Sequence, residues 1–173
     1  EDASRLRHRI DAMLCAAQGA TLQLPEDEVL KYRGAALTDG EGWTAMLEDG
    51  ECTLTFTCYD PVAYGYERTT GEDAFKVGGT AETYPVFECV AAEGDSVMVL
   101  NLLSERFVCV VGDFKGGERV RIDCASEDVT VDGACANADI GVHSDFFPLA
   151  PGACELAFAG CAGHSTTYAE RWY

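Results

Sequence analysis

From Tyr84 onward, the sequence is a succession of short strand-like runs separated by turn signals. The turns fall at Glu93-Gly94-Asp95, Lys115-Gly116-Gly117, Asp132-Gly133 and Pro151-Gly152. Many short strands at a spacing of roughly 8–12 residues are typical of a β-sandwich or jelly roll. We therefore predict a β-sandwich domain over residues 83–173, with strands at 84–91, 96–102, 106–113, 118–125, 128–132, 138–143, 153–159 and 165–172.

The chain opens with the pattern of an amphipathic helix over residues 4–18. Ser4 suits the position before its first turn, and Gly19 suits the position just past its end. Three arginines in the first turns oppose the helix dipole. We expect either that the helix begins upstream of this segment or that the arginines meet acids on a neighbour. The apolar positions that follow the helical period are Leu6, Ile10, Met13, Leu14 and Ala17.

Three strand-like runs follow, at residues 29–37, 43–47 and 52–58, with turns expected at 38–40 and 48–50. In the last run, cysteine, leucine and phenylalanine alternate with three threonines, which is the pattern of a half-buried strand. We predict a three-stranded antiparallel meander. Together with the helix it would form a thin α+β unit over residues 1–64, completed by more chain or by another subunit. Residues 65–82 are rich in Gly, Thr and charge and are expected to form a linker or long hairpin loop.

The chain carries 30 acidic and 12 basic residues, for a net charge of −18. Such a surface repels nucleic-acid phosphates and anionic membranes, so direct binding to either is not expected. No apolar run approaches the roughly 20 residues of a membrane-spanning helix. The chain begins without a methionine or a visible signal peptide, which suggests a fragment or a processed form.

The nine cysteines are odd in number and include no Cys-x-x-Cys pair, so zinc-ribbon and thioredoxin spacings are absent. Several lie in apolar strands, where cysteine behaves as a small hydrophobe. We favour free thiols made in a reducing cytoplasm, with a disulfide framework as the alternative. The cysteines are Cys15, Cys52, Cys58, Cys89, Cys109, Cys124, Cys135, Cys154 and Cys161.

No catalytic, cofactor-binding or metal-ligating residue can be assigned from the sequence. His8, His143 and His164 belong to no metal-binding motif. The adjacent residues 143–145 are of the Ser, His and Asp types used in catalytic triads, but neighbours on a strand point to opposite faces. No spacing singles out a pair of acids for glycoside cleavage, and there is no phosphate-binding glycine loop.

Three aromatic residues leave one binding function open. Tyr84, Tyr168 and Trp172 could form an aromatic platform for a sugar, as in a carbohydrate-binding module. The alternative is that they pack on the sheet or at a subunit contact.

Four strings, taken in order, resemble the distal tail protein family of long, non-contractile-tailed bacteriophages. The resemblance covers nearly the whole chain. It departs in two respects: family members have further N-terminal strands, and Ala153-Cys154 replaces the family's usual polar residue and Asn after Pro-Gly. The chain thus looks like the second half of a ring-forming domain followed by a complete C-terminal domain, and the divergence after Pro-Gly suggests a prophage origin. The strings are Cys58-Tyr59-Asp60-Pro61-Val62-Ala63-Tyr64-Gly65, residues 79–86, residues 144–152, and Glu170-Arg171-Trp172-Tyr173.

The resemblance implies a non-enzymatic structural protein of the virion tail tip, assembled in the bacterial cytoplasm. The N-terminal domain would build a ring, typically hexameric, between the tail tube and the baseplate. The C-terminal domain would be a galectin-like β-sandwich that contacts receptor-binding or other baseplate proteins. The alternatives are a carbohydrate-binding module or receptor-binding protein, and a β-sandwich hydrolase.

Individual residues also receive structural roles. Asp60-Pro61 should end the preceding strand, because proline lacks the N–H that a sheet needs. Gly152 should take a positive φ in a turn. Phe146, Phe147 and Leu149 should anchor their segment in the sandwich, and Leu156 and Phe158 should point inward.

Overall fold

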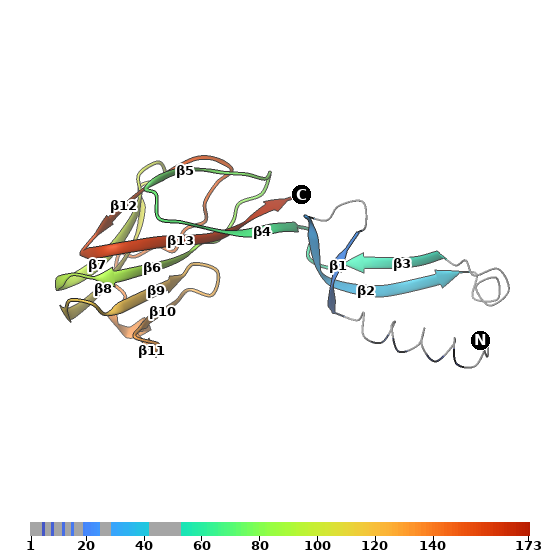
Figure 1. The fold of residues 1–173 in the computed structure, drawn as a ribbon, viewed down its shortest axis with the longest axis horizontal. Coiled ribbons are helices and arrows are strands. Elements are labelled where there is room, and N and C mark those ends of the chain that lie inside the picture. Colours follow the sequence, from blue (N-terminus) through green and yellow to red (C-terminus); the bar gives the residue numbers. More distant parts are fainter. Residues whose placement is uncertain are drawn as a thin grey trace. The chain divides into compact units, whose positions relative to one another are not determined.

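The computed structural model describes residues 5, 8, 12, 15, 19–24, 29–41 and 53–173. The chain divides into two compact units (Figure 1). The first comprises Glu1–Gly65 together with Tyr173, and the second comprises Tyr66–Trp172.

The first unit is organised around one long strand, β2 (Lys31–Glu41). It pairs antiparallel with β1 (Ala20–Gln23) and with β3 (Thr53–Cys58). The first residues of β4 (Ala63–Thr70) also pair with β2, so that Lys31 lies opposite Tyr64. As expected, the threonines of β3 are exposed and the intervening Leu54, Phe56 and Cys58 are half-buried.

The turn expected at residues 38–40 is wrong, because these residues continue β2 opposite Leu54 and Thr55. The runs 29–37 and 52–58 therefore pair directly with each other. The hydroxyls of Thr38 and Thr57 are 3.1 Å apart across this pair, which supports the extended register. The predicted strand 43–47 lies outside the described residues. So does the predicted helix, apart from Arg5, His8, Ala12 and Cys15, which have helical backbone and are exposed.

The second unit consists of two antiparallel sheets (Figure 1). One contains, in spatial order, β4, β13 (Cys161–Trp172), β6 (Val86–Ala91), β9 (Arg119–Asp123), β10 (Asp128–Val131) and β11 (Ala134–Cys135). The other contains β5 (Ala74–Val77), β12 (Gly152–Ala159), β7 (Glu93–Asn101) and β8 (Arg106–Lys115). The predicted all-β character of this region is confirmed.

The buried core of the second unit takes side chains from both sheets. Phe87 and Ile122 come from the first sheet, and Val99 and Val108 come from the second. Phe147, which lies outside the named strands, is fully buried with them, and its ring centroid is 5.6 Å from that of Phe87. The predicted anchoring role of the segment before Pro151 is confirmed, because Leu149 is fully buried and Phe146 packs on the core. Leu156 is buried and Phe158 packs on the core, as expected.

Three predictions for the second unit differ from the structure. Residues 65–82 contain β5 and most of β4 where a linker or loop was expected. The turn expected at residues 93–95 lies inside β7, because a register shift between Gly94 and Ser96 absorbs the turn-forming residues in the sheet. The strand expected at 138–143 is a short 3₁₀ helix, Asn137–Asp139, followed by a single bridge from Ile140 to Val110.

Other turn predictions are confirmed by backbone angles. Asp132 and Gly133, with φ of 48° and 80°, form a two-residue loop between β10 and β11. Gly116 and Gly117 both have positive φ at the end of β8. Gly152 has a φ of 115°, a conformation that is costly for residues with a Cβ.

Phe147→Ala should destabilise the protein by about 3–5 kcal/mol, because it removes a fully buried ring from contact with Phe87 and leaves a cavity. Urea unfolding followed by circular dichroism measures the change. The matched control is Val142→Ala, whose side chain is 95% exposed and should change stability by less than about 0.5 kcal/mol. Equal effects of the two substitutions would contradict the proposed core.

Candidate functional site

The segment that carries the triad residue types covers the outer edge of β8. The Ser144 hydroxyl accepts a hydrogen bond from the Cys109 N–H at 2.9 Å and donates one to the Cys109 carbonyl at 3.1 Å. The backbone N–H groups of Gly141 and Asp145 donate to the carbonyls of Cys109 and Phe107, both at 2.8 Å. His143 is exposed. Ser144 is thus used to satisfy backbone groups at the end of a sheet, and this arrangement is not that of an activated nucleophile.

Asp145 is held by Arg106 at the start of β8. Two guanidinium nitrogens donate to its two carboxylate oxygens, each at 2.7 Å, and Arg106 also donates to the Phe146 carbonyl at 2.7 Å. This bidentate geometry is among the stronger charge-assisted arrangements in proteins. The hydrogen bonds from Arg106 lower the pKa of Asp145 and raise that of Arg106. The pair ties the segment after the 3₁₀ helix to β8.

The prediction that Tyr168 could form part of an aromatic platform for a sugar is wrong. Its ring is only 5% exposed and stacks on Phe75, with centroids 5.4 Å apart. Burial raises the pKa of its hydroxyl, which donates to the Lys76 carbonyl at 3.4 Å. Tyr84 is 45% exposed, and the Arg171 guanidinium lies 5.9 Å from its ring centroid. Tyr168 is therefore a core residue and offers no face to a sugar.

His164 packs on the sandwich through its ring. The imidazole stacks on Phe158 with centroids 3.8 Å apart and an interplanar angle of 10°. Its Nε2 lies 3.0 Å from Asp73 Oδ1, within ion-pair distance but without hydrogen-bond geometry. Within the part of the chain that the structure describes, no group of three or more His, Cys, Asp or Glu residues could hold a metal ion.

The eight described cysteines carry free thiols, and Cys52 lies outside the described residues. Burial raises the pKa of Cys124 to about 12 and that of Cys154 to about 11. Interaction between the side chains of Cys89 and Cys161 raises the pKa of Cys89 and lowers that of Cys161. Cys89, Cys124 and Cys154 belong to the buried core, so they act as small hydrophobic residues.

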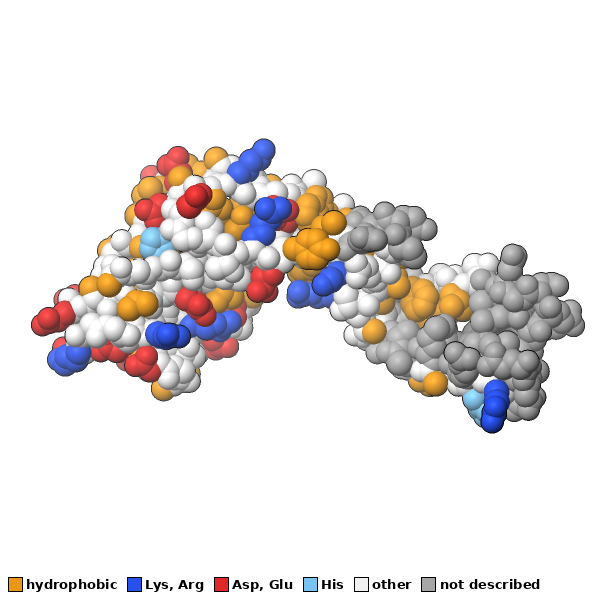
Figure 2. All heavy atoms as spheres, in the orientation of Figure 1, with side chains coloured by type: hydrophobic (Ala, Val, Ile, Leu, Met, Phe, Trp, Pro, Cys, Tyr) orange, Lys and Arg blue, Asp and Glu red, His pale blue; other side chains and the backbone are white. Residues whose placement is uncertain are grey.

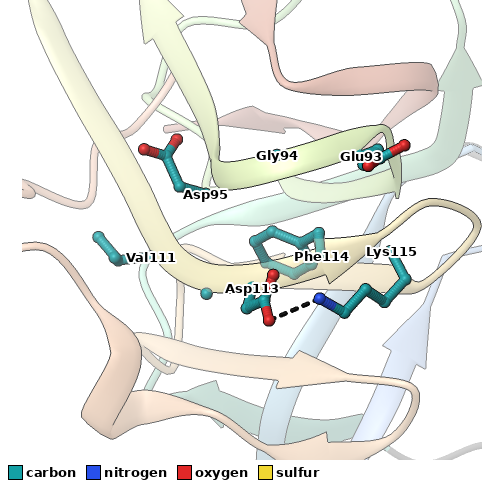
Figure 3. A pocket seen from close by; sticks show the side chains of 8 residues that line it. Glu93, Gly94, Asp95, Val111, Asp113, Phe114 and Lys115 are labelled. Carbon is teal, nitrogen blue, oxygen red and sulfur yellow. Dashed lines mark hydrogen bonds and ion pairs between the residues drawn. The ribbon is translucent and has the colours of Figure 1, made fainter.

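The surface of the second unit carries shallow grooves, and the two largest of those described are the following. One, of about 650 Å³, runs between residues 93–95 of β7 and 111–115 of β8 (Figure 3). Its charged residues are Glu93, Asp95, Asp113 and Lys115, and the last two form an ion pair of 2.6 Å. The other, of about 320 Å³, lies over β13, β6 and β9 around Gly163. The second groove is lined by Cys89, His164 and Ser165, but no hydrogen bond joins the imidazole to either possible nucleophile, and His164 Nε2 has no hydrogen-bond partner.

In the described part of the chain, each carboxyl with a shifted pKa is stabilised as the anion. The pKa of Glu118 is lowered chiefly by a hydrogen bond from the Lys115 N–H, and the pKa of Asp128 is lowered chiefly by the Asn137 side chain. Asp145 shares this direction. A glycosidase-type general acid requires a raised pKa, so these three residues are unsuited to that role.

On the visible face of the second unit, acidic and basic side chains are interspersed (Figure 2).

Asp145→Asn should lower stability near neutral pH, and the loss should disappear in acid. The folded-state pKa of Asp145 lies below the ordinary value of about 3.9, so its contribution is present above that value and lost as pH falls through the folded pKa. Urea unfolding between pH 7 and pH 3 measures this difference. The same substitution in an Arg106→Gln background is the control and should show no such pH dependence. If Asp145→Asn alone lowered stability equally at pH 7 and pH 3, the stabilising role of the ionised Asp145 carboxylate would be contradicted.

Comparison with known proteins places these features in a family context. The family described as siphovirus-type tail component, C-terminal domain, matches residues 78–172. The distal tail protein of Bacillus phage SPP1 is 32% identical over 107 residues, which cover 57% of this chain and 42% of that protein. The chain thus spans less than half the length of this curated relative.

A solved structure shows the same fold. The crystal structure of the SPP1 Dit protein superposes with a TM-score of 0.79 at 20% sequence identity, over 98% of this chain and 73% of the solved chain. That protein is described as a paradigm of the hub adsorption apparatus in phages that infect Gram-positive bacteria. Among the described residues, no helix is both long and apolar enough for a membrane span. The family match covers more than half of the chain, so the chain belongs to the siphovirus-type tail component family.

Proposed function

We propose that the chain is part of a distal tail protein, a structural subunit of the baseplate hub at the tail tip of a phage or prophage virion. It would link the tail tube to receptor-binding or other baseplate proteins. The match of residues 78–172 to the tail component family carries this proposal. The similarity of fold to the SPP1 Dit protein over nearly the whole chain supports it.

The two units suit different tasks in such a hub. The first unit would contribute to a ring, expected to be a hexamer, built together with further chain of the kind that makes the relatives longer. Its described strands form a small sheet with limited core, and such a sheet gains stability by pairing with additional strands. The second unit has its own buried core and would be the galectin-like domain that contacts other baseplate proteins.

A non-enzymatic role fits the chemistry of the second unit. Ser144 and Asp145 are engaged in holding the segment along β8, and the shifted carboxyls remain ionised. The burial of Tyr168 removes support for the carbohydrate-binding alternative based on an aromatic platform.

Antibodies raised against the chain and coupled to gold should label the tail end opposite the capsid on intact virions. Electron microscopy of purified particles measures the position of the label, and particles of an unrelated phage serve as the control. Label along the tube, on the capsid or nowhere on the particle would contradict the proposal.

Native mass spectrometry of the complete encoded protein should show a six-subunit species, and a monomer alone would contradict the ring.

A further inference from the structure

Over part of their length, strands β7, β8 and β12 carry apolar side chains on both faces. Their inner face carries Val97, Val99, Val108 and Val110, all fully buried, and Leu156. Side chains alternate between faces along a strand, so the intervening residues form the outer face. The register of the three strands aligns the outer residues in two cross-strand rows. We call these two rows, together with Val111, the apolar face. The rows are Ala157–Leu100–Phe107 and Ala159–Met98–Cys109.

The sequence pattern of β8 is that of a strand covered on two sides. Residues 107–111 read Phe-Val-Cys-Val-Val, a continuous apolar run. An antiparallel strand with one face in water normally alternates apolar and polar residues, and a continuous run is typical of a strand buried on both faces. Here the sandwich core covers the inner face only. Met98, Leu100, Phe107 and Cys109 stay half-buried, and Val111 is 52% exposed.

The opposite sheet of the same unit provides an internal comparison. One cross-strand row on its outer face is Ser165–Glu88–Arg121–Thr130, which is polar at every position, and isolated valines, Val86 and Val90, flank Glu88 on this face. Both sheets contribute buried residues to one core, so the need to fold does not explain why their outer faces differ. An outward apolar surface of this kind marks an interaction site.

The charges beside the apolar face indicate what covers it. Burial and the nearby Asp95 carboxylate raise the pKa of the Cys109 thiol, and Asp113, which pairs with Lys115, follows Val111 on the same side of β8 (Figure 3). Glu155 precedes Ala157 on the same side of β12 and is exposed. A second copy of this face would bring like charges together, which is unfavourable. A partner with lysine or arginine around an apolar centre would match both features.

We infer that the apolar face is the docking surface for a different tail protein, one that presents an apolar patch bordered by basic side chains. The inference deepens the proposed function and rests on it. Docking would occur through the face of the sheet, because the outer edge of β8 is already hydrogen-bonded by Gly141, Ser144 and Asp145.

A photoreactive amino acid placed at Val111 tests the occupant in intact virions. We expect mass spectrometry to identify a crosslink to a different virion protein, at a peptide that contains lysine or arginine. Glu88, exposed on the outer face of the opposite sheet, is the control position and should not reach the same peptide. Two outcomes would overturn the inference and leave the tail assignment standing. One is a crosslink to a second copy of this chain. The other is the absence of any crosslink when the chain is present in the virion. Absence of the chain from the virion would overturn both.

Leu100→Lys in the phage-encoded protein should reduce the amount of the partner in purified tails by roughly tenfold or more, because a charge would be buried in the interface. The matched control is Thr130→Lys, at a half-buried outer position of the opposite sheet. This substitution should change the amount of the partner in purified tails by less than about twofold. Circular dichroism of both variants checks that they fold. A second pair, Asp95→Lys and Asp113→Lys, should weaken docking without adding a charge to the centre of the face. Unchanged protein composition in folded Leu100→Lys tails would overturn the inference.

Discussion

The second unit depends on the closure of two sheets over one set of apolar side chains. Phe87 on β6 and Phe147 on the segment before β12 meet at its centre, and valines of β7 and β8 complete the layer. Each buried side chain of this size contributes about 1.5–3 kcal/mol relative to exposure. Because Phe147 and Leu149 lie on a segment without regular strand pairing, the core also fixes the course of that segment across the sandwich.

The sequence predicted the strands of the second unit wherever alternation and positive-φ turns coincided. Asp132-Gly133 and Gly116-Gly117 are such cases. It failed where turn-forming residues lie inside paired strands, as at residues 38–40 and 93–95, because long-range pairing can absorb such residues at an irregularity in register. Residues 65–82 were misjudged for a related reason. Their composition resembles a loop, but β4 and β5 gain partners far along the chain.

The sequence supplied less information about sites. It argued against a triad at residues 143–145 from strand geometry, whereas the structure adds the role of Ser144 as a partner for the Cys109 backbone. Tyr168 could not be separated from the exposed aromatics, because both packing and sugar binding favour the same residue type. The continuous apolar run of β8 was visible, yet only the register with β7 and β12 shows that its outward residues join into one surface.

The hydrogen bonds along the outer edge of β8 have a consequence for how copies of the protein behave when crowded. A bare strand edge beside an apolar surface would recruit further strands without limit, and the product would be a fibre. With Gly141, Ser144 and Asp145 occupying that edge, strand-to-strand growth is blocked there. The protein can therefore expose an apolar surface beside this edge at high concentration without adding further strands to the edge.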